Sequence, residues 1–264
     1  MERRVRRIAV AILGVFLAGC ATKNGSEAGW RPLFDGKTLT GWTPKIRGYA
    51  LGENTLDTFK AENGVLRVSY EKYDRFGERY GHLFYKAPFK SFRLKLEYRF
   101  IDGTPADTPA WAQANNGVMI FAQDPATMAI GDSFPVSVEA QILGPAEGQT
   151  RTNGNVCSPG TNIVMDGKLV TEHCINSKVP AAPNGSWVRF EIDAAPDGSV
   201  TEKQNGVTTI TWSDPQLDPE GRMANSKPLV AAAGGKLALG GGYIALQSEG
   251  APIEFRNIEI MELK

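Results

Sequence analysis

Apolar and polar residues alternate along much of the chain with the period of two that is typical of β-strands. The longest uninterrupted example covers residues 92–100, Phe-Arg-Leu-Lys-Leu-Glu-Tyr-Arg-Phe. Shorter runs of the same kind cover residues 64–70, 117–123, 135–143, 187–194, 243–248 and 252–263. Asn205-Gly206 separates two further runs, and this dipeptide tolerates the two positive φ angles of a tight hairpin. These patterns predict an all-β protein.

The segments between the runs are rich in Gly, Pro, Asn and Asp, and no amphipathic helix longer than two turns is evident. Strands joined in this way predict a sandwich or barrel of antiparallel strands. In the last run the apolar positions slip from odd numbers at Ile253 to even numbers at Ile258, which predicts a β-bulge near Asn257. No linker or repeat divides residues 30–264, so we expect one domain there.

Residues 1–19 have the composition of an export signal. Four arginines precede an apolar run over residues 8–16, which is too short to span a membrane. Ala18-Gly19-Cys20 resembles a bacterial lipobox, in which the cysteine sulfur is acylated and the chain is cut before it. An uncut anchor, or a secretory signal followed by a chance cysteine, remains the alternative. Residues 20–29 are small and polar and predict a flexible tether.

Charge and export together limit the partners that we expect. The full chain has 29 basic and 29 acidic residues, so it has no basic excess with which to bind nucleic acid. Removal of residues 1–19 leaves a mildly acidic protein whose membrane contact is the lipid alone. We expect it in the cell envelope, on the outer membrane or in the periplasm of a Gram-negative host, because Ala21 follows the cysteine. The oligomeric state stays open.

If Cys20 carries lipid, Cys157 and Cys174 remain as an even pair in a compartment where disulfides persist. We therefore predict a disulfide between them, worth about 3 kcal/mol in the chain-entropy model. Two free thiols or a zinc site are the alternatives, and the latter has little support because the chain holds two histidines and no Cys-x-x-Cys.

The residues of opposite parity to the apolar positions are candidates for a ligand-binding face. If Leu94 and Val138 point inward, then Arg99 and Glu139 point outward from their strands. We expect one polar face that brings together Arg93, Lys95, Glu97, Arg99, Gln123, Ser137, Glu139, Gln141, Tyr243 and Gln247. Planar polar side chains of these types suit the hydroxyl pairs of a sugar, although any sandwich also has a solvated face that carries charges.

Five segments resemble, in order, those of a bacterial family called 3-keto-disaccharide hydrolases, once known only as a domain of unknown function. The opening segment is Trp30-Arg-Pro-Leu-Phe-Asp-Gly-Lys-Thr-Leu-Thr-Gly-Trp42. The others are residues 92–100 with Asn115-Asn116-Gly117-Val118, then Val138-Glu-Ala-Gln-Ile-Leu143, then residues 184–206, and finally residues 242–258. The resemblance extends from Trp30 to Leu263.

This resemblance implies a concanavalin-like or jelly-roll sandwich of two antiparallel sheets with sugar bound on a concave polar face. It also implies a substrate oxidised at C3 of its sugar. A C3 ketone acidifies the C2 proton, so a base can remove that proton and the C1 substituent then leaves by β-elimination. Added water makes the reaction a hydrolysis, and without water it is a lyase reaction. No cofactor is certain, although a divalent metal ion could stabilise the enolate oxygen.

The resemblance places the Glu139-x-Gln141 motif in the sugar site, and Glu139 is the expected base. The sequence departs from the family pattern between Asn153 and Ser177, in a long insertion-like loop that holds His173 next to Cys174. His173 is therefore the second catalytic candidate, although a histidine in such a loop is often plain surface. His82 is a weaker candidate, and Trp111 is either a sugar-stacking ring or a core plug. The expected substrate-binding residues are Glu97, Arg99, Trp111, Asn116, Gln123, Gln141 and Gln247.

Two other functions remain open at this stage. A carbohydrate-binding surface lipoprotein without catalytic activity has the same fold, because fold does not fix function. A retaining glycosidase needs two carboxylates about 5 Å apart. The residue two positions after Glu139 is the amide Gln141, which argues against a simple glycosidase.

Overall fold

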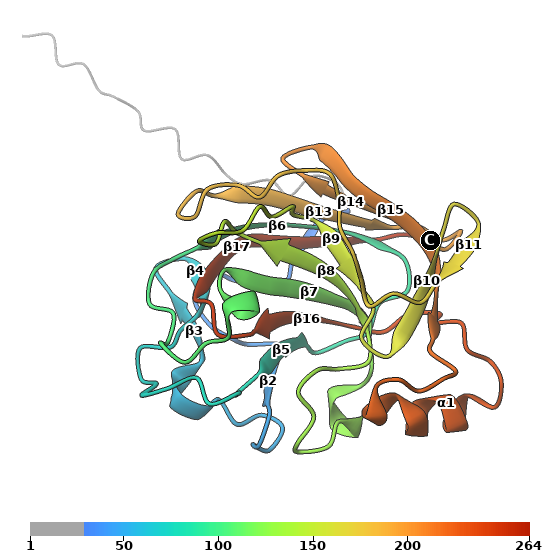
Figure 1. Ribbon diagram of the computed structural model, residues 1–264, viewed down its shortest axis with the longest axis horizontal. Helices are drawn as coiled ribbons and strands as arrows, with labels where there is room; N and C mark the ends of the chain where they lie inside the picture. The colour runs from blue at the N-terminus through green and yellow to red at the C-terminus, as the bar shows by residue number, and fades with distance from the viewer. Residues whose placement is uncertain (1–28) are drawn as a thin grey trace, which may run out of the picture.

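The computed structural model describes residues 29–264, so the predictions for residues 1–19 and for Cys20 lie outside the described residues. Two antiparallel sheets pack face to face, which confirms the predicted all-β sandwich (Figure 1). Within residues 29–264, no helix is long and apolar enough to cross a membrane.

The larger sheet has ten strands. In spatial order they are β11 (Lys168–Val170), β10 (Thr161–Met165), β15 (Val207–Leu217), β14 (Ser199–Gln204), β13 (Val188–Ala194), β6 (Phe92–Phe100), β17 (Ile253–Glu262), β4 (Val65–Val68) and β3 (Phe59–Glu62), with β1 (Arg31–Pro32) paired to β17.

The smaller sheet has seven strands. Their order is β12 (Cys174–Ile175), β9 (Asn155–Cys157), β8 (Val138–Leu143), β7 (Asn115–Ala122), β16 (Tyr243–Ser248), β5 (Gly81–Tyr85) and β2 (Trp42–Ile46). The helical segments are short: α1 (Lys227–Ala233), η1 (Thr55–Asp57), η2 (Ala110–Ala112), η3 (Pro125–Thr127) and η4 (Ala224–Ser226). Helix α1 lies at the lower right of Figure 1, beside the seven-stranded sheet.

The apolar residues that alternate with polar ones in the sequence form the core between the two sheets. In β6 every second residue, from Phe92 to Phe100, is buried, while the residues between them are exposed or half-buried. The inward residues of β7 and β8, Val118 and Val138 among them, are fully buried on the opposite side of the same core. The period-two pattern therefore placed these inward faces correctly.

Two local predictions are confirmed. The register of β17 against β6 shifts between Arg256 and Glu259, and Asn257 has a φ of 52°, as a bulge at this point requires. The β14–β15 hairpin turns at Asn205 and Gly206, whose φ angles of 49° and 82° are both positive.

Asn153 fixes the segment before β9 to both sheets. Its side-chain oxygen accepts a hydrogen bond from the backbone N–H of Leu143 at 2.7 Å, and its amide donates to the Tyr98 hydroxyl at 2.8 Å. The Ser177 hydroxyl donates to the Asn153 carbonyl oxygen at 2.6 Å. Since Leu143 and Tyr98 belong to different sheets, this fully buried asparagine holds the segment against the sandwich edge.

Glu202 is a carboxyl group within the core itself. It projects inward from β14, and one of its oxygens accepts a hydrogen bond from Trp212 Nε1 at 3.1 Å, while Oε2 has no partner. Burial raises the pKa of Glu202 to about 8 despite that hydrogen bond. The carboxyl therefore holds its proton at neutral pH, and an unprotonated Glu202 would destabilise the fold.

Glu202→Gln should change how stability depends on pH. The folded-state pKa is raised, so the contribution of Glu202 is fully present below the unfolded pKa and is lost as pH rises toward 8. Glutamine does not titrate. Relative to Glu202→Gln, the parent should therefore lose up to about 1.4 kcal/mol of unfolding free energy per pH unit between about pH 5 and pH 8. Urea unfolding at several pH values measures this, and a parallel pH dependence of parent and variant would contradict it. Exposed Glu53→Gln is the control.

Candidate active site

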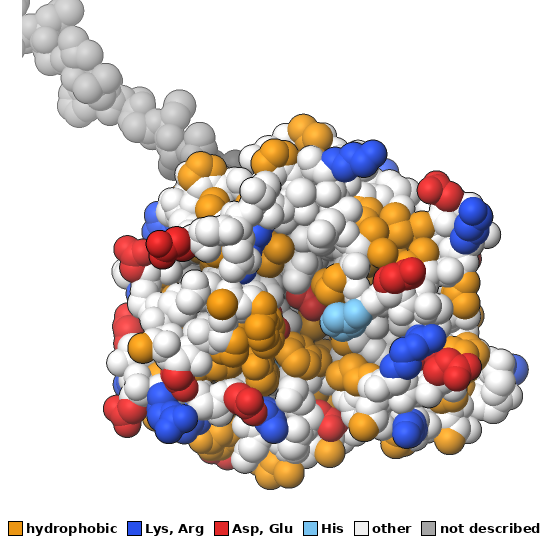
Figure 2. Space-filling model, in the orientation of Figure 1, with side chains coloured by type: hydrophobic (Ala, Val, Ile, Leu, Met, Phe, Trp, Pro, Cys, Tyr) orange, Lys and Arg blue, Asp and Glu red, His pale blue; other side chains and the backbone are white. Residues whose placement is uncertain are grey.

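The outer face of the seven-stranded sheet carries a row of polar residues across its strands, called the polar row below. Residues directly opposite one another on neighbouring strands present their side chains on the same face. The polar row is Lys45 (β2), His82 (β5), Gln247 (β16), Gly117 (β7), Gln141 (β8) and Asn155 (β9). Figure 2 shows a hollow near the middle of the molecule, with acidic side chains and a histidine at its edge.

Glu139 lies in the next row of the same face, opposite Met119 and Cys157. Its side chain folds over Gly117, because a Cβ atom at position 117 would stand 2.5 Å from Cγ and 2.7 Å from Cδ of Glu139. The missing side chain of Gly117 thus makes the space that the carboxyl group occupies. Glu139 is 6% exposed and has no hydrogen bond or ion pair within residues 29–264.

Glu139 is electrostatically coupled to a second buried carboxyl group, Glu249. Burial raises the pKa of Glu139 to about 8. Burial, and after it the charge of Glu139, raises the pKa of Glu249 well above its usual range, and Glu249 Oε2 has no partner. Two desolvated carboxyl groups that repel each other do not both ionise near neutral pH. One can therefore act as a base while the other keeps a proton.

His82 and Gln247 are buried beside this pair without partners. Neither has exposed surface, and neither ring nitrogen of His82 nor either amide atom of Gln247 forms a hydrogen bond. Burial, followed by the charge of Lys45, lowers the pKa of His82 to about 3, so its imidazole is neutral. Buried polar atoms without partners are uncommon in native proteins, and they mark a place where a ligand can supply the missing contacts.

A cavity of about 370 Å³ opens next to the polar row. Its lining is Trp111, Asn115, Gln141, Leu143, Gln149, Thr150, Arg151, Thr152, Cys174 and Asn176. Trp111 is 51% exposed and stacks on Tyr80 with 6.1 Å between ring centroids, so it is not a core plug. Asn155 donates a hydrogen bond to Gln141 Oε1 at 3.0 Å. An exposed aromatic ring beside ordered amides suits a sugar ring and its hydroxyl groups.

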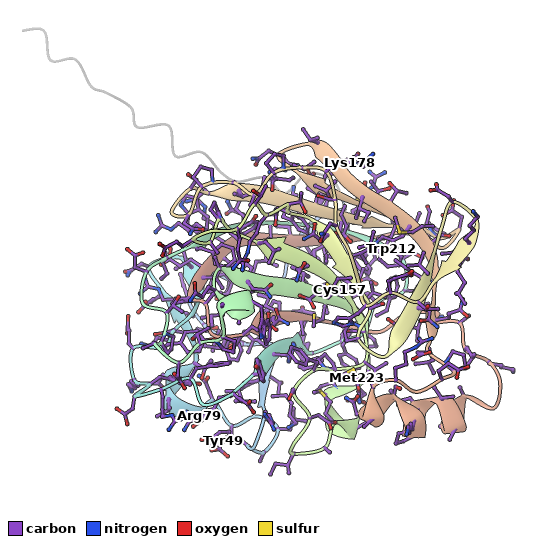
Figure 3. The ribbon with its side chains drawn as sticks, in the orientation of Figure 1. Tyr49, Arg79, Cys157, Lys178, Trp212 and Met223 are labelled. Atoms are coloured by element: carbon purple, nitrogen blue, oxygen red, sulfur yellow. A yellow bond between two sulfur atoms is a disulfide. The ribbon has the colours of Figure 1, made fainter. Side chains whose placement is uncertain are left out.

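The Cys157–Cys174 disulfide borders this site, and its presence confirms the predicted pairing. The two cysteines face each other across β9 and β12, and Cys157 also faces Glu139. Figure 3 labels Cys157, the last residue of β9, near the middle of the molecule. The disulfide therefore anchors the edge strand β12 to the sheet that carries Glu139.

His173 adjoins Cys174 but is not among the residues that line the 370 Å³ cavity. It is exposed and lines a different cavity, of about 320 Å³, together with Asp218 and Arg222. Its backbone carbonyl accepts a hydrogen bond from the N–H of Ser158 at 2.8 Å. A catalytic role for His173 stays a prediction, and His82 is the histidine that belongs to the polar row.

The expectation that Glu97 and Arg99 share a face with Glu139 is wrong. Both belong to β6 in the ten-stranded sheet, whereas Glu139 belongs to the other sheet. Glu97 accepts a hydrogen bond from Arg256 Nε at 2.6 Å, and Arg99 Nε donates to Glu254 at 2.6 Å. Arg93 and Lys95, also in β6, lie on that sheet too. Strand parity separates inside from outside, but it does not assign a strand to a sheet.

Asn116 and Gln123 also lie away from the polar row. Asn116 has the inward parity of Val118, is fully buried, and donates to the backbone carbonyl of Gln247 at 2.7 Å. Phe121 has a φ of 51°, and the β7–β16 register shifts there, so parity does not carry through to Gln123. Gln123 Oε1 accepts from the N–H of Val136 at 2.8 Å and prolongs the strand pairing.

Sequence reasoning missed two residues of the site, Asn115 and Glu249. Asn115 lies two positions before Gly117 in β7, so its side chain points to the same outer face. Its Oδ1 accepts a long hydrogen bond from the Gln141 amide at 3.5 Å. Glu249 continues the outward positions of β16 beyond Gln247. Extending each strand pattern by one step would have included both.

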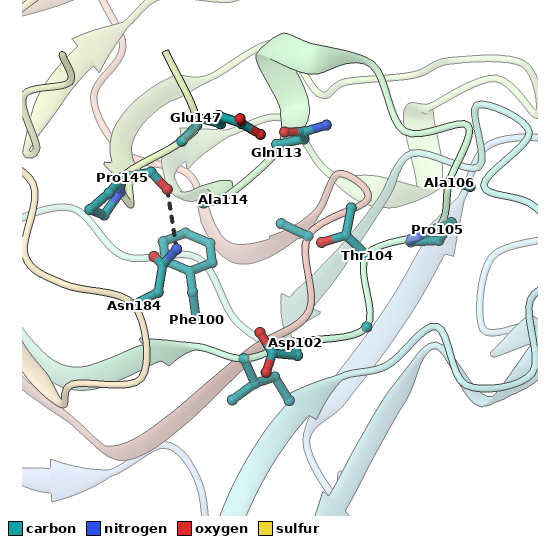
Figure 4. Close-up of a pocket in the computed structure, with 14 residues that line it drawn as sticks. Phe100, Asp102, Thr104, Pro105, Ala106, Gln113, Ala114, Pro145, Glu147 and Asn184 are labelled. Carbon is teal, nitrogen blue, oxygen red and sulfur yellow. Dashed lines mark hydrogen bonds between the residues drawn. The ribbon is translucent and has the colours of Figure 1, made fainter. Parts of the chain in front are cut away.

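A further cavity of about 410 Å³ lies among the loops at the end of the sandwich (Figure 4). Asn184 crosses it and donates to the Pro145 carbonyl oxygen at 3.1 Å. The cavity next to the polar row is the better candidate site, because its lining includes Gln141 of that row and Cys174, whose disulfide partner Cys157 faces Glu139.

The sequence profile of the 3-keto-alpha-glucoside-1,2-lyase-like domain family matches residues 29–261. The chain belongs to this family. A search of the curated proteins finds no match. Its family and its β-sandwich fold together indicate that the protein is a carbohydrate-active enzyme.

Solved structures agree with the fold of this 3-keto-alpha-glucoside-1,2-lyase-like domain. A protein of Parabacteroides distasonis that is assigned as a glycosyl hydrolase is 23% identical, with 89% of this chain and 99% of that chain covered and a TM-score of 0.52. A Bacillus subtilis protein of unknown function with a galectin-like fold is 13% identical, with 88% and 94% covered and a TM-score of 0.53. At these identities the likeness concerns the fold alone.

The described residues of this 3-keto-alpha-glucoside-1,2-lyase-like domain do not fit a divalent metal ion. No three His, Cys, Asp or Glu side chains among residues 29–264 are grouped so that they could bind one. Glu139 and Glu249 are coupled, but they have no third ligand with them. We therefore derive no chemical step through a metal.

Gly117→Ala should lower the pKa of Glu139 in this family member. The new methyl group would occupy the space of the carboxyl group and displace it toward solvent. We expect the Glu139 titration to fall by at least about one pH unit, because desolvation is the cause of its raised pKa. NMR of ¹³C-labelled glutamate carboxyls measures this. Gly131→Ala is the control, since a Cβ there meets nothing within 4 Å. A titration that stays near pH 8 in Gly117→Ala would show that the glycine does not set the environment of Glu139.

Proposed function

We propose that the protein cleaves glycosides whose sugar carries a ketone at C3. The observation that supports this most is the desolvated Glu139 carboxyl over Gly117, without a counter-ion and coupled to Glu249. A carboxylate in such a place is a stronger base than one in water. Its pKa of about 8 lies close to neutral pH, where general-base catalysis is most effective.

The proposed reaction begins at C2 of the oxidised sugar. Ionised Glu139 takes the C2 proton, and the electron pair of the C2–H bond is delocalised onto the C3 oxygen as an enolate. The enolate then re-forms the ketone, the C1–C2 double bond forms, and the glycosidic C1–O bond breaks. The departing oxygen takes the proton that Glu249 retains. Addition of water across C1 and C2 completes a hydrolysis, and release before that step makes the enzyme a lyase.

The cavity next to the polar row has the chemistry of a sugar site. Its volume of about 370 Å³ is in the range of small-ligand sites. Trp111 offers an exposed ring face, and the amides of Asn115 and Gln141 offer both donors and acceptors for hydroxyl groups. We assign the reacting sugar or its aglycone to this cavity.

The carboxyl pair also favours a second candidate, a retaining glycosidase. Such an enzyme uses one ionised and one protonated carboxyl group on an unoxidised glycoside. The two candidates differ in substrate, since the glycosidase needs no ketone. Parallel assays with a 3-keto-glucoside and with its parent glucoside distinguish them.

Glu139→Gln tests the proposed function. The amide keeps the size of the side chain but accepts no proton, so we expect kcat for a 3-keto-glucoside to fall at least ~100-fold. The melting temperature should stay within a few degrees of the parent. Glu191→Gln, the same substitution on the outer face of the other sheet, should leave kcat unchanged.

The pH profile gives an independent readout of the same residue. For the parent, kcat/KM should rise as pH approaches 8, because the base must lose its proton. Glu139→Gln should abolish that rise. Full turnover in a folded Glu139→Gln protein would exclude Glu139 as the base.

We further propose that the protein is exported and anchored to the cell envelope by lipid on Cys20. The support is the order of basic residues, apolar run and Ala18-Gly19-Cys20 in the sequence. Cys20→Ala should move the protein from the membrane fraction to the soluble fraction, as immunoblots of the fractions would detect. Thr22→Ala is the control. A Cys20→Ala protein that stays with the membrane would contradict the anchor.

A further inference from the structure

His82 and Gln247 form a pair of polar side chains that nothing in the described protein satisfies. They face each other across β5 and β16, and neither has exposed surface. All four of their side-chain nitrogen and oxygen atoms lack hydrogen-bond partners. Buried Asn116, on the neighbouring strand, is half satisfied: its amide donates to a backbone carbonyl, while its Oδ1 has no partner. Two adjacent unsatisfied groups on the face that carries Glu139 point to a ligand atom that they both bind.

The surroundings of His82 make it a hydrogen-bond donor and not a base. Its ring stands 5.9 Å from that of Phe134 and 6.2 Å from that of Phe84, between centroids. Lys45, opposite it in the register, is 3% exposed and brings a positive charge. Burial and this charge keep the imidazole neutral, so one ring nitrogen carries a proton that it can donate. The Gln247 amide adds two more donor hydrogens.

The strand register places this pair next to the base on the same face of the sheet. Glu139 lies over Gly117, and Gln247 is beside Gly117 in the polar row. Neighbouring strands are about 4.8 Å apart. C2 and C3 of a sugar are bonded to each other, so a ring that directs its C2–H at Glu139 carries the C3 oxygen one strand further, toward Gln247 and His82.

We propose that His82 and Gln247 bind the C3 ketone oxygen of the substrate and stabilise the enolate that forms on it. This inference rests on the proposed function and adds the residues that would recognise the oxidised sugar. Lys45 contributes its positive charge from the far side of His82. The donors of His82 and Gln247 suit the C3 ketone oxygen, which accepts hydrogen bonds but donates none. Their hydrogen bonds to this oxygen are strongest when it becomes the negatively charged enolate oxygen.

His82→Ala and Gln247→Ala should each lower kcat for a 3-keto-glucoside by about 10²- to 10³-fold, as loss of one oxyanion donor does. KM should change much less. Gln247→Met removes the donors but keeps much of the length of the side chain, so it should lose as much as Gln247→Ala. Ser248→Ala is the control, because Ser248 neighbours Gln247 but bonds to Tyr70 on the core side. Melting temperatures verify that each variant folds.

A binding measurement separates this inference from the proposed function. In the Glu139→Gln background, calorimetry should show that a methyl 3-keto-glucoside binds at least about 10-fold tighter than methyl glucoside, which is about 1.4 kcal/mol of binding free energy. Adding Gln247→Met should abolish that preference. A preference that survives both Gln247→Met and His82→Ala would overturn the inference and leave the proposed function standing. If Glu139→Gln shows no preference for the ketone and the parent does not cleave the keto sugar, both are wrong.

Discussion

The close approach of the Glu139 side chain to Gly117 is the contact on which the candidate site depends. A side chain at position 117 would collide with the carboxyl group, so only glycine lets a glutamate from the next strand lie flat on the sheet. In that position the carboxyl group loses water and gains no counter-ion, which is unfavourable for its charged form. The result is a base whose pKa lies near 8 and which is coupled to a second acid, Glu249.

A site of this kind reduces stability, because several polar groups are buried without partners. The sandwich offsets this with a large apolar core between the sheets, in which residues such as Trp212 and Phe255 are fully buried. The Cys157–Cys174 disulfide and the hydrogen bonds of Asn153 hold the edge of the seven-stranded sheet in place. The base therefore projects from a rigid sheet and not from a loop, which preserves its alignment with a substrate.

The sequence was sufficient to predict the sandwich, the bulge at Asn257 and the disulfide, because each depends on local pattern or on cysteine count. It was sufficient for Glu139, Gln141 and Gln247 as members of one outer face, because strand parity decides that. It did not separate Glu97 and Arg99 from them, since the pairing of strands into sheets depends on long-range packing. It also misplaced Gln123. Phe121 has a left-handed backbone conformation that breaks the alternation of inward and outward side chains, and a phenylalanine gives no sequence signal for such a conformation.

The central claim is that the chain removes the C2 proton of an oxidised sugar before the glycosidic bond breaks. A 3-keto-glucoside that carries deuterium at C2 tests this most directly, with cleavage followed by NMR in ordinary water. We expect slower cleavage of the deuterated substrate and loss of the deuterium to solvent. Cleavage at an unchanged rate, with the deuterium retained at C2 of the product, would contradict the account.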